Sequence, residues 1–150
     1  MADIRFGVFT KPWNDAIERV ADRMAALGVE AIELPIRPGY QVTPETVKTS
    51  LPNVVRALES RGLSICSVAA PLDDDIIAAC GDNGVTIVRT MASIDLKKAG
   101  YAETIAQCRA RYDELIPLLD RTGVRIGVQN HSGNAVGSAI GLFHLMEKYD

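Results

Sequence analysis

A glycine followed at once by a short apolar run occurs four times in this chain, and this repeat constrains the fold more than any other feature. The glycines are Gly28, Gly62, Gly84 and Gly123. Glycine readily takes the left-handed conformation that ends a helix, and the β-branched run after it is typical of a buried strand. The repeat therefore predicts four helix ends that each lead into a strand, and residues 4–10 add a fifth strand at the start.

Helical patterns lie between these strands. Apolar residues recur at the spacing of an amphipathic helix over residues 17–27, 51–58, 105–119 and 136–146. A shorter and weaker helix is predicted over residues 73–83. Strands that alternate with helices imply a parallel sheet, which is either an open doubly wound sheet or a closed barrel. A complete eight-unit barrel takes roughly 250 residues, so five units mean that barrel units are missing or that the fold is open.

The composition argues against several functional classes. A hydrophobic fraction of 47% with 23% charged residues is ordinary for a globular domain. The net charge of −3, with scattered Lys and Arg, leaves no basic field for a nucleic acid. No apolar stretch reaches the roughly 20 residues of a membrane helix, and the N-terminus lacks a secretion signal. We therefore predict a cytoplasmic protein without nucleic-acid or membrane partners.

We expect the functional polar residues to follow the strands, because parallel α/β folds place their catalytic and ligand-binding residues at the carboxyl ends of the strands. The densest group is the run Gln129, Asn130, His131, Ser132 and Gly133, which comes directly after an apolar segment. Burying such a run without hydrogen-bond partners is costly. A ligand or a metal ion is therefore a candidate partner at the end of the fifth strand.

Most of the individual polar and aromatic residues near the strand ends have more than one interpretation. Glu33 lies within an apolar strand, so it either has a role in the site or forms a buried ion pair with Arg89. Arg89 in turn either binds a phosphate or carboxylate or neutralises Glu33. Lys11 and Trp13 follow the first strand, where Trp13 either stacks on a substrate or is an ordinary rim aromatic. His131 is a candidate ligand, base or cap of the next helix.

The pattern resembles the sugar phosphate isomerase/epimerase family, the xylose-isomerase-like TIM barrels. Three segments carry the resemblance: Ala-Ile-Glu-Leu at 31–34, Val-Arg-Thr at 88–90 and above all Val-Gln-Asn-His-Ser-Gly at 128–133, which looks like the family motif E-N-H-x-G. The resemblance spans the whole chain. It implies an α/β fold of the parallel (β/α) TIM-barrel type, with about five βα units in one domain over residues 1–150 that is incomplete at its C-terminus.

The resemblance also implies a function. It points to an isomerase or epimerase, or a dehydratase, that acts on a small sugar, polyol or hydroxy-carbonyl substrate by metal-assisted proton transfer, with Mn, Mg or Co as the divalent metal. Gln129 takes the metal-ligand position, and Glu33 and His131 are the candidate catalytic residues. The candidate substrate-binding residues are Lys11, Trp13, Arg89 and Asn130.

One departure from the family pattern supports an alternative. Gln129 stands where the family has glutamate, and an amide carries no charge and cannot take a proton from carbon. The alternative is a non-catalytic sugar- or acid-binding barrel that holds its ligand through Gln129, Asn130 and Arg89. An open-sheet nucleotide-binding domain is a third hypothesis, but the sequence has no phosphate-loop glycine motif. Open strand edges also allow a homo-oligomer.

Overall fold

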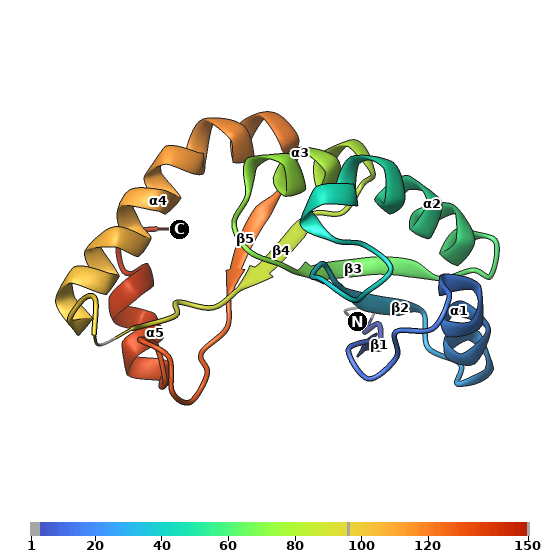
Figure 1. The fold of residues 1–150 in the computed structure, drawn as a ribbon, viewed down its shortest axis with the longest axis horizontal. Coiled ribbons are helices and arrows are strands. Elements are labelled where there is room, and N and C mark those ends of the chain that lie inside the picture. Colours follow the sequence, from blue (N-terminus) through green and yellow to red (C-terminus); the bar gives the residue numbers. More distant parts are fainter. Residues whose placement is uncertain (1–3, 96, 150) are drawn as a thin grey trace.

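The computed structural model describes residues 4–95 and 97–149 (Figure 1). Five parallel strands form one sheet: Gly7–Phe9 (β1), Ala31–Pro35 (β2), Ser64–Ala69 (β3), Ile87–Thr90 (β4) and Arg125–Val128 (β5). The helices are Ile17–Ala26 (α1), Val47–Glu59 (α2), Asp74–Asp82 (α3), Tyr101–Thr122 (α4) and Ala139–Met146 (α5), with a 3-10 turn at Pro44–Thr46 (η1). Within the described ranges, no helix has the length and apolar character needed to cross a membrane.

The order of the strands decides between the two architectures that the sequence leaves open. In a doubly wound sheet the strand order reverses at a switch point, and helices cover both faces. Here each strand pairs in parallel with the next strand of the chain, from β1 to β5. Figure 1 shows α1 to α4 around the outer side of a curved sheet. This arrangement is that of a (β/α) barrel, which confirms the predicted fold class.

The four repeat glycines end helices as predicted. Gly28, Gly62, Gly84 and Gly123 all have φ between 68° and 71°, in the left-handed region that favours glycine. Each glycine is followed within three residues by the start of a strand. The sequence repeat and the structural repeat therefore coincide at these positions.

The first strand and the last helix are shorter than predicted. Pairing with β2 is confined to Gly7–Phe9, and Ile4 and Phe6 before it are about three-quarters exposed. The last helix begins at Ala139, because Ser138 caps it by accepting a hydrogen bond from the Gly141 backbone N–H. The apolar periodicity read from residue 136 thus includes part of the preceding loop.

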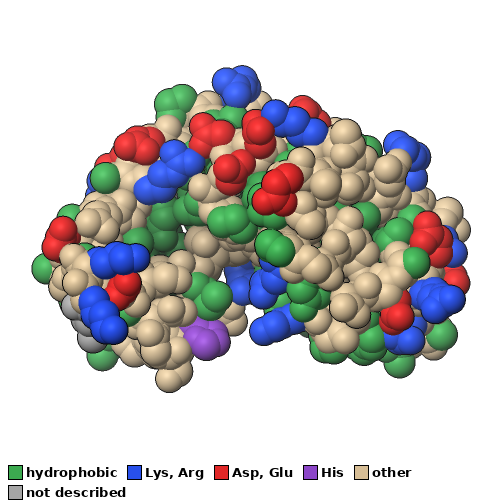
Figure 2. Space-filling view, viewed as in Figure 1, with side chains coloured by type: hydrophobic (Ala, Val, Ile, Leu, Met, Phe, Trp, Pro, Cys, Tyr) green, Lys and Arg blue, Asp and Glu red, His purple; other side chains and the backbone are tan. Residues whose placement is uncertain are grey.

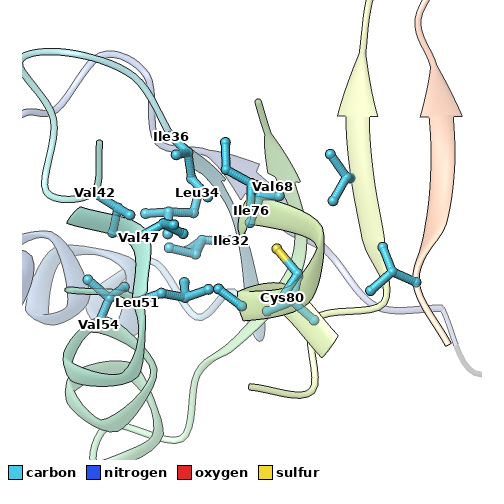
Figure 3. Packing of buried hydrophobic residues seen from close by; sticks show 14 of the residues in the cluster. Ile32, Leu34, Ile36, Val42, Val47, Leu51, Val54, Val68, Ile76 and Cys80 are labelled. Atoms are coloured by element: carbon cyan, nitrogen blue, oxygen red, sulfur yellow. The ribbon is translucent and has the colours of Figure 1, made fainter. Parts of the chain in front are cut away.

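The core lies between the sheet and the outer helices (Figure 3). Ile32 and Leu34 of β2 and Val68 of β3 are fully buried, and they pack with residues such as Ile76 of α3. Burial of one such side chain stabilises the fold by roughly 1.5–3 kcal/mol. Because alternate residues of a strand point to opposite faces, Glu33 lies on the inner face, away from this core.

The three cysteines differ in their environments. Cys80 is buried in the core, and this burial raises the pKa of its thiol to about 12. Cys108 is half-buried, but Cys66 is exposed, and its thiol donates a hydrogen bond to the Ile32 carbonyl oxygen at 3.2 Å. Free cysteines are usually buried, so Cys66 is an exception.

Close packing of α3 against the end of α4 requires Gly81. A Cβ atom there would lie 2.7 Å from the Thr122 Cβ and 3.1 Å from its carbonyl oxygen. Alanine favours a helix over glycine by about 1 kcal/mol, whereas overpacking costs about 1–3 kcal/mol. We expect Gly81→Ala to lower the free energy of unfolding by about 1 kcal/mol in urea titrations. Gly141→Ala inside α5, where the nearest atom to a Cβ is the Ser138 Oγ at an ordinary 3.5 Å, is the control, and an equal loss there would contradict the packing argument.

Candidate active site

Polar side chains from neighbouring strands meet on the inner face of the sheet, at its carboxyl edge. The register aligns Phe9 of β1 with Glu33 of β2, and Glu33 with Ser67 of β3. A register shift between Ile32 and Glu33 places Ser67 rather than Cys66 beside the carboxylate. Such irregularities re-aim side chains next to functional sites.

Arg89 of β4 is at the centre of this group. Its Nε donates to Glu33 Oε1 at 2.9 Å, and its Nη2 donates to Glu33 Oε2 at 3.0 Å. Its Nη1 donates to Gln129 Oε1 at 2.6 Å, and the Ser67 hydroxyl donates to Glu33 Oε1 at 3.0 Å. The guanidinium carbon also lies 4.9 Å from the centroid of the Phe9 ring. We call these five residues, from all five strands or their ends, the Arg89 cluster.

The charge state of Glu33 follows from these contacts. Burial by itself would raise the pKa of Glu33, but the hydrogen bonds from Arg89 and Ser67, together with the charges of Arg89 and Arg37, hold it below its ordinary value of 4.5. The side chains of Glu33 and Arg89 are only 19% and 17% exposed. Glu33 is therefore a carboxylate at neutral pH that fixes the arginine, which is the ion-pair interpretation of this residue.

Asn130 and His131 lie in the loop after β5 and are exposed. Within the described residues, neither side chain bonds to the Arg89 cluster. The His131 Nδ1 lies 2.7 Å from the Ser132 carbonyl oxygen, and the His131 backbone N–H donates to Val136. The structure thus brings Gln129 to Arg89 and leaves the next two residues at the rim.

The two residues predicted after the first strand are also separate from the cluster. Lys11 is exposed, and its carbonyl oxygen accepts a hydrogen bond from the Tyr40 hydroxyl at 3.0 Å. Trp13 is half-buried and packs against the main core, with the Arg23 guanidinium 5.8 Å from its ring centroid. The ring of Trp13 is therefore used in packing, and substrate binding by either residue stays a prediction.

A cavity of about 300 Å³ adjoins Arg89 at the carboxyl ends of β2, β3 and β4. Its lining includes Arg37, Ala70, Arg89, Thr90, Met91 and Ser93. A larger cavity of about 470 Å³ lies elsewhere, between α4, α5 and the amino end of β5. Barrels of this type bind substrates at the carboxyl ends of their strands, so the smaller cavity is the candidate site.

Comparison with solved structures places this geometry in a known fold. A structure of IolI with a bound zinc atom aligns with a TM-score of 0.74 at 13% identity, over 97% of this chain and 59% of that chain. A D-tagatose 3-epimerase-like protein aligns with a TM-score of 0.72 at 15% identity, over 98% of this chain and 61% of that one. The chain has the fold of a xylose isomerase-like TIM barrel. At these identities the likeness establishes the fold alone.

A third xylose isomerase-like barrel, from Mycobacterium smegmatis and solved in complex with magnesium, aligns with a TM-score of 0.63 at 14% identity, over 96% of this chain and 60% of that one. This chain therefore spans about 60% of the length of these barrels. The sequence matches no protein-family model and no curated protein.

The Arg89 cluster does not fit a divalent metal by itself. Zinc and magnesium occur in two of the similar barrels, but the described part of this chain contains no group of three His, Cys, Asp or Glu side chains placed to hold a metal. The Gln129 oxygen and both Glu33 oxygens already face the Arg89 guanidinium. A cation beside them would meet a fixed positive charge, so a metal in this barrel needs ligands beyond the cluster.

Two members of the cluster, Phe9 and Ser67, were not among the predicted site residues. Ser67 interrupts the apolar run of its strand, and this interruption is a usable signal once the strand is known to border Glu33. Phe9 gives no such signal, because an aromatic residue in a strand normally indicates packing. Its place below Arg89 depends on the register of β1 with β2.

The lowered pKa of Glu33 predicts how stability changes with pH. The ion pair stabilises the fold above the unfolded pKa, and this contribution is lost as the pH falls through the lower folded value. We expect the free energy of unfolding to fall from about pH 4.5 downward, and to fall less steeply in Glu33→Gln. Urea titrations across the acid range measure this, with exposed Glu59→Gln as the control. Parallel curves for wild type and Glu33→Gln would contradict the prediction.

Proposed function

We propose that this chain forms the ligand-binding face of an isomerase- or epimerase-like barrel that acts on a small sugar, polyol or hydroxy-carbonyl molecule. The observation that carries the proposal is the Arg89 cluster, a preorganised set of polar groups beside a cavity at the carboxyl ends of the strands. The fold shared with an epimerase-like protein and with IolI supports it.

Arg89 is suited to stabilise negative charge on a substrate oxygen. Removal of a proton from the carbon next to a carbonyl moves charge onto the carbonyl oxygen, and fixed donors aimed at that oxygen lower the barrier. Three of the five N–H groups of Arg89 carry the bonds to Glu33 and Gln129, which leaves two for a ligand. Glu33 holds the guanidinium in place, so little reorganisation is needed when charge develops.

His131 is the better candidate for the base. Glu33 is a poor one, because both of its oxygens accept hydrogen bonds from Arg89 and its pKa is lowered. A carbonyl oxygen only accepts, so the contact between His131 Nδ1 and Ser132 requires the hydrogen on Nδ1. In the neutral imidazole the Nε2 lone pair is then free to take the substrate proton and return it to the neighbouring carbon.

The metal-assisted form of this chemistry is part of the sequence-based hypothesis. A divalent cation bound elsewhere in the barrel would polarise the substrate carbonyl. Within this chain, the roles are binding by Arg89 and Gln129 and proton transfer by His131. None of these roles depends on a metal ligand from the Arg89 cluster.

A non-catalytic binding barrel is the second candidate. The observation in its favour is that the two acceptor groups of the cluster, the Glu33 carboxylate and the Gln129 amide oxygen, are both bonded to Arg89. Such a cluster holds a ligand by donating hydrogen bonds and offers no free carboxylate for proton transfer.

Proton exchange separates the two candidates. Each of a panel of small ketoses, hydroxy-carbonyl acids and polyols is incubated with the protein in D₂O, and loss of C–H signals beside the carbonyl or hydroxyl carbon is followed by NMR. We expect exchange for at least one compound, and a parallel assay with a chelator reports any metal requirement. Saturable binding without exchange for the whole panel would contradict catalysis and support the binding barrel.

A further inference from the structure

Arg37 is a second arginine at the candidate site, and it lies two residues beyond the end of β2. Its backbone N–H donates to the Val42 carbonyl oxygen, which fixes the loop, and its guanidinium carbon lies 5.8 Å from the Tyr40 ring centroid. Among the described residues, no carboxylate lies within 4 Å of this guanidinium. Arg37 is half-buried and lines the cavity of about 300 Å³ together with Arg89.

This cavity carries an excess of positive charge. Glu33 forms an ion pair with Arg89 and interacts with the charge of Arg37 only at longer range, so two arginines share one carboxylate, and no Asp or Glu lines the cavity. Figure 2 shows Lys and Arg side chains in and along one side of the notch at the lower centre, a His on its other side, and no Asp or Glu at its edges. A half-buried cation is partly desolvated, so a ligand that brings a negative charge to it gains more than it would in open solvent.

The other groups of the cavity suit a small anion. Arg89 keeps two N–H donors, and the side chains of Thr90 and Ser93 on the cavity wall carry hydroxyl groups. The apolar part of the cavity wall is formed by Ile36, Pro71 and Met91. The volume is at the lower end of the range of small-molecule sites, which suits a molecule of a few carbon atoms rather than a nucleotide.

We propose that the cavity between Arg37 and Arg89 binds a carboxylate or phosphate group of the ligand. The substrate class is then an acidic one, a hydroxy acid, sugar acid or sugar phosphate, rather than a neutral sugar. This choice of substrate class rests on the proposed function, whereas the binding of an anion at Arg37 does not require catalysis. Arg89 orients the group by hydrogen bonds, and Arg37 supplies the uncompensated charge.

Calorimetric titration tests the proposal with three probes: glycerate, glycerol phosphate and uncharged glycerol. We expect at least one of the two anions to bind, with glycerol about tenfold weaker or worse, and Arg37→Gln to weaken anion binding by about tenfold. The stronger of the two anions identifies carboxylate or phosphate as the preferred group. Arg19→Gln, at an exposed position of α1 outside the cavity lining, is the matched control.

Three results would overturn the anion site: no binding of either anion, equal binding of glycerol, or equal losses in Arg37→Gln and Arg19→Gln. Arg37→Lys, which keeps the charge, should retain most of the affinity and so separates charge from loss of packing. Circular dichroism of each variant checks that it is folded. If anions bind in a way that depends on Arg37 but no substrate exchanges its protons, the catalytic proposal is refuted and the anion site stands. If protons exchange but no anion binding depends on Arg37, the anion site is refuted and the catalytic proposal stands.

Discussion

Arg89→Met is expected to lower the free energy of unfolding by about 2–3 kcal/mol and to abolish ligand binding at the carboxyl ends of the strands. Removing one partner of a buried ion pair typically costs about 3–5 kcal/mol, because the other charge stays buried without compensation. The Glu33 and Arg89 side chains keep 19% and 17% exposure, so we reduce that figure for solvent screening. Urea titration at neutral pH measures the loss.

The double variant Glu33→Gln/Arg89→Met is the matched control for this prediction. It removes both charges, so it should recover a large part of the stability lost in Arg89→Met, and the double-mutant cycle then gives the coupling between the two residues. Ligand binding should stay lost in the double variant, because the donors of Arg89 are gone. A loss below about 0.5 kcal/mol in Arg89→Met would show that the pair is not a structural support of the site.

His131→Ala is expected to reduce proton exchange of the substrate by about 10²- to 10⁴-fold, the usual contribution of a general base. The affinity for the same substrate should change little, because within the described residues the His131 side chain bonds to the Ser132 carbonyl oxygen and not to the Arg89 cluster. The side chain is exposed, so the free energy of unfolding should stay within about 0.5 kcal/mol of the wild-type value. NMR in D₂O measures the rate of proton exchange, and calorimetry measures the affinity for the substrate.

His144→Ala is the control for His131→Ala. His144 lies on α5 and stacks on Tyr101 at 6.2 Å between ring centroids, and its side chain has no hydrogen bond to the Arg89 cluster within the described residues. Its replacement should leave exchange unchanged, and added imidazole should restore part of the activity of His131→Ala. Unchanged exchange in His131→Ala would remove His131 from the mechanism and leave the base to be sought elsewhere.

The fold could be predicted from the sequence because its signals are local. Gly28, Gly62, Gly84 and Gly123 take the left-handed conformation that the repeat implies, and a strand follows each of them. Local signals could not decide between an open sheet and a barrel, since both use the same βα units. That decision depends on which strands pair, from β1 with β2 through to β4 with β5.

The candidate site could be predicted only in part. The sequence predicts that Glu33, Arg89 and Gln129 lie together, because each is a polar residue within or directly after an apolar strand, and they do meet in space. Their roles in ligand binding or catalysis stay predictions. Lys11 and Trp13 also follow a strand in the sequence, but the loop after β1 packs the half-buried Trp13 ring against the core. The direction of a loop depends on tertiary packing, which no strand-end pattern contains.

The central claim is that ligand binds beside Arg89 and Arg37, at the carboxyl ends of the strands. A crystal structure of the protein soaked with glycerate or glycerol phosphate, whichever binds more tightly in calorimetry, tests it most directly. We predict electron density for the anionic group within hydrogen-bond distance of both guanidinium groups, in the cavity of about 300 Å³. Density instead in the larger cavity between α4, α5 and β5, with the Arg89 side empty, would contradict the account.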